Sequence, residues 1–241
     1  MFQTFLTQPF YNGFVYLIGI MPGGDVGFAI IVLTLLIRTI FYPAFAASIR
    51  TQIGMQTVQG EVDRINEQYK DDANERARLT MELFKANNIR PFSSILALLV
   101  QIPVFIALYW AFFREGLPKI ATHLLYTFVP TPVVVNTEFL GMVNLLKPHN
   151  LLFALLVAGL QYVVAKLSVS RMKNGTAKAD PAKEAAQRMQ QQMLLYFLPS
   201  LMGFVTYSFP AAVGLYFIVG NIYSIGQELL IKRQMQQKAA R

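Results

Sequence analysis

The chain contains five apolar runs, each close to the length of a helix that crosses a lipid bilayer. They cover residues 27–47, 93–113, 151–170, 191–209 and 211–231. About 20 apolar residues span the hydrocarbon core, where a single helix satisfies its own backbone polar groups. Hydrophobic residues make up 54% of the 241 residues and charged residues only 14%, which leaves too few polar groups to cover a globule. The sequence predicts an all-α integral membrane protein with five transmembrane helices.

Basic residues are distributed unevenly among the segments that join these runs. Of the 21 Lys and Arg residues, three lie in segment 114–150 and one, Arg38, lies near the middle of a run. All the others lie in or beside segments 48–92, 171–190 and 232–241. Cytoplasmic loops of membrane proteins accumulate Lys and Arg, so we expect the N-terminus outside and the C-terminus in the cytoplasm. The net charge of +8 is then mainly a topology signal, and DNA is not an expected partner.

The two outer segments suit the membrane interface. Segment 1–26 is expected to hold an amphipathic helix lying on the outer membrane surface. Its apolar residues recur at spacings of 1, 3 and 4: Phe2, Phe5, Leu6, Phe10 and Phe14. Segment 114–150 is apolar but interrupted by prolines, which favours an outer loop over a further span.

Segment 48–92 differs from its surroundings because it is rich in both acidic and basic residues. An apolar seam with spacings of 3, 4, 3 and 4 runs through its first half: Met55, Val58, Val62, Ile65 and Tyr69. Asp72 and Glu75 then have the spacing of a helix-capping arrangement, and Pro91 discourages continuation of the second helix. We predict an antiparallel helical hairpin in the cytoplasm, the alternative being a solvated charged loop. Segment 171–190 is expected to be a polar cytoplasmic loop, and 232–241 a basic cytoplasmic tail.

Arg38 stands near the middle of the first run, where a charge costs roughly 3 kcal/mol on insertion scales. Arginine does not escape this cost by losing its proton. An interhelical ion pair would need a carboxylate at similar depth. The other runs contain no Asp, and their one Glu, Glu228, lies in the last turn of the fifth. The compensation that remains is water together with neutral polar groups, so the sequence favours a hydrated groove over an ion pair.

Neutral polar residues of the other runs are candidates to line this groove. Thr34 and Tyr42 share a helical face with Arg38 at positions i−4 and i+4. The fifth run carries a stripe of Tyr216, Gly220, Tyr223 and Gln227 at spacings of 4, 3 and 4. Each residue alone is more typical of an interhelical hydrogen bond than of a functional site. The complete candidate set is Arg38, Thr34, Tyr42, Gln101, Gln161, Tyr216 and Asn221.

The sequence argues against an enzyme. There are no cysteines, and the two histidines, His123 and His149, both lie outside the runs. The runs therefore hold neither a Ser–His pair nor an HExxH motif, and no metal or cofactor is expected. A small ion or solute channel remains an alternative, and it would need polar groups that continue to the outer face.

Three stretches resemble the YidC/Oxa/Alb family of membrane protein insertases, particularly its compact prokaryotic members. They are "LLIRTIFYP", "ILALLVQIPVFIALYWAF" and "YFLPSLMGFVTYSFPAAVGLYFIVGNIYSIGQELLI". The last stretch matches the family pattern at Pro199, Pro210, Gly214, Leu215, Tyr216, Asn221 and Gln227. Arg38 corresponds to the family's groove arginine.

This resemblance implies five helices around a polar groove that opens to the cytoplasm and to lipid but is closed towards the outside. It implies insertion of nascent membrane proteins into the bilayer of a prokaryotic plasma (inner) membrane, without bond chemistry. The ribosome and the Sec translocon are candidate partners for the hairpin and the basic tail.

Overall fold

A computed structural model describes residues 8–91, 106, 117–169, 188–189 and 191–239. The described chain is mostly helical, which agrees with the predicted fold class. The main helices are α1 (Gln8–Ile20), α2 (Val26–Ile40), α3 (Tyr42–Thr57), α4 (Gln59–Gln68), α5 (Ala73–Ala86), α7 (Leu151–Val169), α9 (Leu198–Ser208) and α10 (Ala211–Ala239). Short elements complete it: the 3₁₀ turns Pro22–Gly24 and Thr122–Leu124, the π-helical turn Met193–Phe197, and the antiparallel strands β1 (Glu138–Phe139) and β2 (Val143–Asn144).

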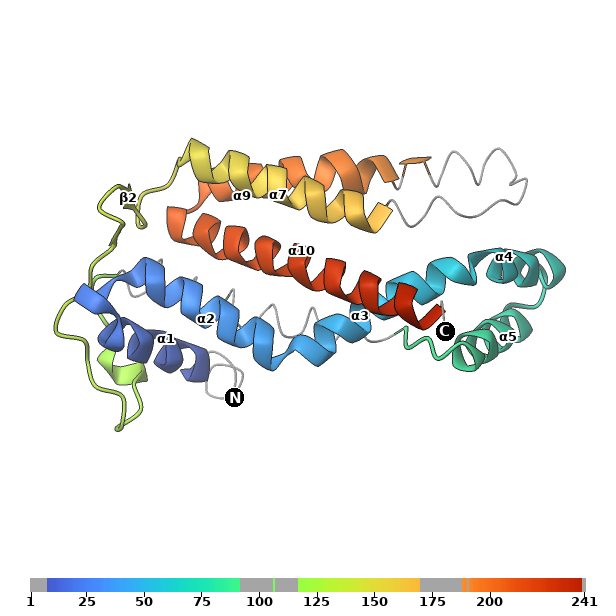
Figure 1. The fold of residues 1–241 in the computed structure, drawn as a ribbon, viewed down its shortest axis with the longest axis horizontal. Coiled ribbons are helices and arrows are strands. Elements are labelled where there is room, and N and C mark those ends of the chain that lie inside the picture. The colour runs from blue at the N-terminus through green and yellow to red at the C-terminus, as the bar shows by residue number, and fades with distance from the viewer. Residues whose placement is uncertain (1–7, 92–105, 107–116, 170–187, 190, 240–241) are drawn as a thin grey trace.

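Helix α10 lies in the middle of the described bundle. It packs against α7 and α9 on one side and against α2 and α3 on the other (Figure 1). Among the described helices, α7 alone is long and apolar enough to span a membrane, and α2 with α3 qualifies as one bent pair. The apolar segment Met193–Ser208 is shorter. Run 93–113 lies almost entirely outside the described residues, so the count of five spans stays a prediction.

The first predicted span, 27–47, is divided between two helices. Asp25 caps α2 because its carboxylate accepts hydrogen bonds from Gly27 N at 2.7 Å and Phe28 N at 3.0 Å. Helix α2 ends at Ile40, and α3 leaves it at an angle of 64°. Pro43, in the first turn of α3, has no N–H to donate and clashes with a continuous preceding turn. The bend therefore falls directly after Arg38.

Helix α1 is fastened to the outer loop by buried polar groups. Asn12 is 2% exposed, and its side chain donates to Leu124 O at 2.9 Å and accepts from Tyr126 N at 2.7 Å. The Tyr11 hydroxyl accepts from Ala121 N at 2.9 Å. The apolar face of α1 turns inwards, since Phe14 is 1% exposed within the protein core. Phe2, Phe5 and Leu6 of the predicted surface helix lie outside the described residues.

The outer loop also closes over the start of α10. Ala211 N donates to Lys147 O, and Ala212 N donates to Leu145 O, both at 3.0 Å. Leu145 is completely buried among apolar side chains of the core. A further bond from His149 N to Tyr207 O, at 2.8 Å, attaches the loop to the end of α9. This end of the bundle is therefore packed with apolar side chains and covered by backbone-bonded loop.

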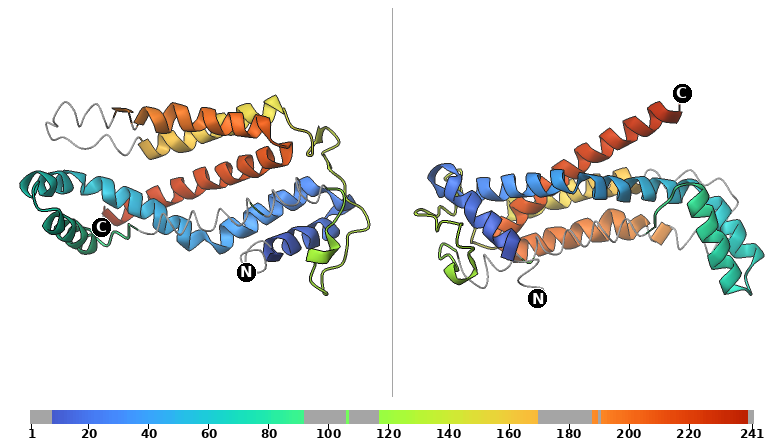
Figure 2. Two further views of the ribbon diagram at one scale, coloured as in Figure 1. Left: turned by 180° about the vertical axis from the view of Figure 1, so that it is seen from behind. Right: turned by 90° about the horizontal axis from the view of Figure 1, so that it is seen from below.

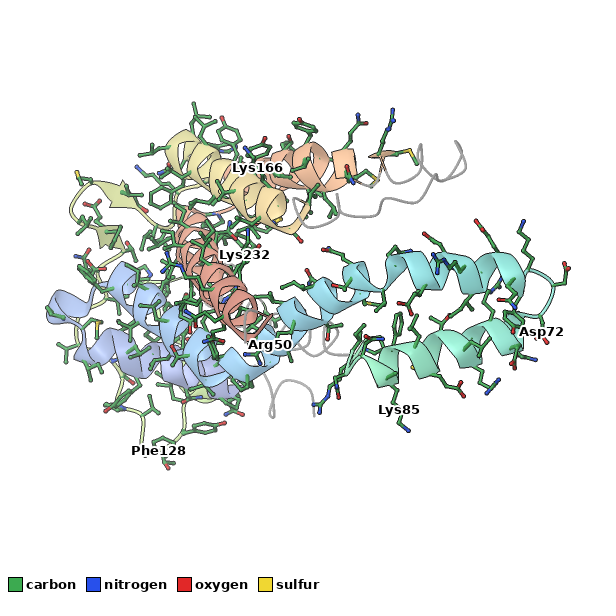
Figure 3. All side chains as sticks on the ribbon, turned by 45° about the vertical axis from the view of Figure 1, so that its right-hand side comes forward. Arg50, Asp72, Lys85, Phe128, Lys166 and Lys232 are labelled. Carbon is green, nitrogen blue, oxygen red and sulfur yellow. The ribbon has the colours of Figure 1, made fainter. Side chains whose placement is uncertain are left out.

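Helices α4 and α5 form an antiparallel hairpin that projects from the far end of α3 (Figures 1 and 2). The predicted cap is confirmed, because the Asp72 carboxylate accepts from Asn74 N at 3.1 Å and Glu75 N at 2.9 Å. At the base of the hairpin, Ile89 is buried against Gly54, so the segment that follows α5 packs against α3. Figure 3 shows Asp72 at the tip of the hairpin and Phe128 at the opposite end of the molecule.

An exposed ion-pair cluster supports α5. The Arg78 guanidinium donates to the carboxylates of Glu75 and Glu82. The hydrogen bond from Arg78, and then its charge, hold the pKa of Glu75 below its usual range. Because folding lowers this pKa, the contribution is present above the unfolded pKa of about 4.3 and is lost as pH falls through the lower folded value. The hairpin thus keeps this support throughout the neutral range.

Replacing Asn12 tests the attachment of α1 to the outer loop. Asn12→Ala leaves the Tyr126 N–H without its acceptor, which costs about 1–3 kcal/mol, and removes one of the two side-chain donors to Leu124 O, the other being Gln8 Nε2 at 3.0 Å. We expect a lower unfolding temperature in detergent. Gly13→Ala is the matched control, because a Cβ there meets nothing within 4 Å and should leave stability equal or slightly higher. Equal unfolding temperatures for Asn12→Ala and the unmodified chain would contradict the attachment.

Candidate functional site

A cavity of about 270 Å³ lies between α2, α7, α9 and α10 at the level of Arg38. It is lined by polar and apolar side chains together: Arg38, Gln161, Val164, Met202, Tyr216, Phe217, Gly220, Asn221 and Ser224. Most of these residues belong to α10, which presents successive turns to the cavity because residues three and four apart share one helical face. The space is large enough for several water molecules, each of which occupies about 30 Å³ in the liquid.

Arg38 reaches this cavity from the last turn of α2. Its guanidinium lies close to α10, where a Cβ added at Gly220 would be 3.3 Å from Nη2. Its Cζ also lies 4.5 Å from the centre of the Phe45 ring. Among the described residues no carboxylate oxygen comes within 4.0 Å of the guanidinium. In this part of the chain the charge is therefore accompanied by an aromatic face, neutral polar groups and cavity space.

Three further predicted residues meet Arg38 at the cavity: Gln161 from α7, and Tyr216 and Asn221 from α10. Thr34 does not line it. This residue is 2% exposed, and its hydroxyl donates to Ile30 O at 2.6 Å within its own helix. Tyr42 lies beyond the bend.

Gln101 lies outside the described residues, so its predicted place in the groove is a proposal.

The remaining lining residues were missed at the level of sequence. Val164, Met202 and Phe217 are apolar and carry no polar signal, whereas Ser224 is a small polar residue. Ser224 could have been predicted from the sequence. It lies one turn beyond Gly220 and three residues beyond Asn221, so helical spacing from the predicted stripe would have included it.

The predicted stripe on α10 has a second role. Its C-terminal half, Tyr223 and Gln227, runs along the bend between α2 and α3. The Tyr223 hydroxyl lies 3.4 Å from Thr39 Oγ1. Gln227 is 3% exposed, and its Nε2 donates to Tyr42 O at 3.2 Å, immediately after the break. The same helix face therefore lines the cavity with Tyr216 and Gly220 and braces the bend with Tyr223 and Gln227.

The described side chains of the cavity offer hydrogen-bond donors. Asn221 is 8% exposed, and its Nδ2 has no hydrogen-bond partner among the described residues. The Arg38 guanidinium is a donor without acceptor capacity. These groups suit a ligand rich in acceptors, such as a carboxylate or an exposed peptide carbonyl. Within the described chain no cluster of three His, Asp or Glu residues could hold a metal ion.

Comparison of the sequence with known proteins finds relatives of this chain. Residues 18–238 match the family described as "60Kd inner membrane protein". The "Membrane protein insertase YidC" of Oceanobacillus iheyensis is 32% identical over 216 residues, covering 88% of this chain and 76% of that protein. Proteins of the same description from Francisella tularensis subsp. novicida and subsp. tularensis are 32% identical over 213 residues. The match covers 88% of this chain but only 33% of those longer proteins.

Thiol labelling of two adjacent valines tests whether the cavity holds water. Val164 lines the cavity, whereas Val163 is 40% exposed on the outer side of α7. The chain has no cysteine of its own, so Val164→Cys and Val163→Cys each introduce a single thiol at one depth. In a lipid nanodisc we expect the cavity thiol to react roughly tenfold or more faster with a charged maleimide, because a hydrocarbon environment raises a thiol pKa by a unit or more.

In the protein without lipid, Val163 is more exposed than Val164, yet we expect the thiol at position 164 to react faster. Faster labelling of Val163→Cys in nanodiscs would show that the cavity is dry. In detergent-free denaturant the two variants should label equally, which controls for intrinsic reactivity.

Proposed function

Because the chain belongs to the 60Kd inner membrane protein family, whose relatives include proteins named membrane protein insertase YidC, we propose that it inserts newly made membrane proteins into the bilayer. The clients that suit it have one apolar helix and a short polar N-terminal tail. The cavity at Arg38 is the observation that carries this proposal, since it offers polar groups among otherwise apolar helices. No bond is made or broken, so the protein acts by lowering a barrier.

In the proposed step the tail enters the groove from the cytoplasm and meets Arg38. A carboxylate on the tail exchanges part of its water for charge-assisted hydrogen bonds from the guanidinium, helped by Asn221, Gln161 and Tyr216. Hydration of the groove shortens the hydrocarbon distance that the polar tail must cross. Gln101 and Tyr42 belong to the proposed groove on the basis of the sequence, whereas Thr34 supports α2 through its hydrogen bond to Ile30 O.

The apolar segment of the client is proposed to leave along the outer surface of α7 and α9. Large apolar side chains stand there without cover from the described chain, including Leu155 at 63% and Phe204 at 68% exposure. Transfer of the client helix from water to lipid supplies the driving force, at about 25 cal/mol per Å² of apolar surface. The protein then needs no nucleotide or ion gradient of its own for this step.

The packing at the outer end of α10 supports an insertase over a channel. Ala211, Ala212 and Leu145 are at most 1% exposed, and the outer loop is hydrogen-bonded across them. A channel would need polar groups along this end as well. Polar lining begins instead at Tyr216, one turn further in. Purified protein in vesicles is accordingly expected to show no selective conductance that depends on Arg38.

The proposed setting is a prokaryotic inner membrane, with the hairpin and the C-terminus in the cytoplasm. Lys232 and Arg233 of α10 are exposed at the end towards α3, where they can meet anionic lipid or the ribosome. The hairpin and the C-terminal end of α10 point in opposite directions in the right-hand view of Figure 2. A ribosome or a Sec translocon could thus contact one without displacing the other.

Substitution of Arg38 tests the proposed function. Arg38→Ala should lower insertion of a single-span client with an acidic tail roughly tenfold or more, because a charge-assisted hydrogen bond contributes about 1.5–3 kcal/mol. Arg38→Lys keeps the positive charge and should retain much of the activity. Insertion is measured in proteoliposomes by protection of the translocated tail from protease. Arg50→Ala is the control, since Arg50 is exposed on α3 and does not line the cavity.

Equal insertion by all of these variants, with the protein folded, would reject the role of Arg38. A loss that is the same for acidic and for neutral tails would also reject it, because the proposed contact depends on the charge of the tail.

The proposed step should be independent of pH near neutrality. The step uses a guanidinium, tyrosine hydroxyls and tail carboxylates, and side chains of these types do not ordinarily change protonation between about pH 6 and pH 8. Insertion rates measured between about pH 6 and pH 8 should be constant, and they should fall only as the tail carboxylates take up protons below about pH 5. A sigmoidal change centred near pH 6.5 would indicate that a histidine takes part, contrary to the proposal.

A further inference from the structure

Arg38 touches a side chain on the far side of the bend. The arginine belongs to α2, whereas Phe45 belongs to the first turn of α3, and the two helices meet at 64°. The guanidinium carbon nevertheless lies only 4.5 Å from the centre of the Phe45 ring. Residues seven apart on a straight helix would be separated by about 10 Å along the axis, so the bend creates this closeness.

The contact is of a kind that holds a guanidinium in place. A cation within about 6 Å of a ring centre is attracted to the negative face of the aromatic ring. The planar guanidinium also stacks on aromatic faces with little loss of its other hydrogen bonds. Since no described carboxylate competes for Arg38, the Phe45 face is a major restraint on the direction of the charge in the described structure.

Phe45 belongs to α3, the helix that carries the hairpin, and it is not among the residues that line the cavity. Helix α3 passes into α4 with only Val58 between them: Val58 N donates to Gly54 O of α3 at 3.2 Å, and Val58 O accepts from Val62 N of α4 at 3.0 Å. The orientation of α3 therefore sets the orientation of the hairpin. Gln227 braces the bend from α10 through Tyr42 O, and Phe45 connects α3 to the charge in the cavity.

We infer that Phe45 is a positioning residue for Arg38 and that it couples the guanidinium in the cavity to the orientation of α3 and the hairpin. The inference rests on the proposed function, because it concerns how Arg38 is offered to an acidic tail. The Phe45 ring holds the guanidinium by its face, so the N–H donors at its edge remain free for a tail carboxylate. Occupation of the cavity and the orientation of α3 are then coupled, and any coupling between two sites is reciprocal.

Three variants separate the aromatic face from simple packing. Phe45→Leu removes the ring, Phe45→Tyr keeps it, and cyclohexylalanine at position 45 keeps its shape without the π-electrons. The measurement is the ratio of insertion rates for two clients whose tails differ only by Asp or Asn. We expect Phe45→Leu and the cyclohexyl variant to lower this ratio about two- to fivefold, and Phe45→Tyr to retain it. Phe128→Leu is the control, because Phe128 is 77% exposed and does not line the cavity, so this variant should leave the ratio unchanged.

A second measurement does not depend on insertion. Single cysteines at Lys85 on α5 and Lys166 on α7 carry spin labels, and the distance distribution between them reports the orientation of the hairpin. Arg38→Ala and Phe45→Leu should each broaden the distribution, and the double variant should broaden it no further, because both remove the same contact. Additive broadening would overturn the coupling.

The outcomes distinguish this inference from the proposed function. If Arg38→Ala abolishes discrimination between the tails while the cyclohexyl variant retains it, the inference is wrong and the proposed function stands. If Arg38→Ala itself retains discrimination, the proposed function is wrong, and the distance measurement still decides whether Phe45 positions the guanidinium.

Discussion

The free energy required to keep a guanidinium among apolar helices is the constraint on which the arrangement around Arg38 depends. The group cannot lose its proton, and the described chain brings no carboxylate within 4.0 Å of it. Three features meet this cost together. The glycine at position 220 lets the charge approach α10, the Phe45 ring offers an aromatic face, and a cavity of about 270 Å³ leaves room for water. Each feature would have no evident purpose without the charge.

Helix α10 connects the surroundings of Arg38 to the rest of the bundle. The predicted outer loop covers its first turn, and its middle turns line the cavity with Tyr216 and Asn221. Further along the helix, Gln227 braces the bend between α2 and α3. One helix therefore separates a closed end, which we propose faces outwards, from a polar middle and a bent, hairpin-bearing end. This division suits a protein that accepts a polar tail from one side and releases an apolar helix sideways, which is the function we propose for this family member.

Much of the candidate site could be predicted because helical periodicity and depth within an apolar run place residues at one level. Gln161 and Asn221 line the cavity, as their positions near the middle of their runs suggested, and Tyr216 lines it as a member of the stripe on α10. Thr34 shows the limit of that reasoning. It shares a face with Arg38, yet its hydroxyl is used by Ile30 O one turn earlier, as buried threonines in helices commonly are. Spacing says which face a side chain occupies but not which partner it takes.

The sequence by itself determined the helical class, the capped hairpin at Asp72 and the need to compensate Arg38. These follow from composition, local hydrogen bonding and the cost of a charge in hydrocarbon, which are properties of short segments. Only the tertiary structure decided how the compensation is made. The 64° bend after Ile40 brings Phe45 back to Arg38, and the packing of α10 across that bend sets the cavity wall. Both depend on contacts between segments far apart in the chain, and no local pattern specifies an angle between helices.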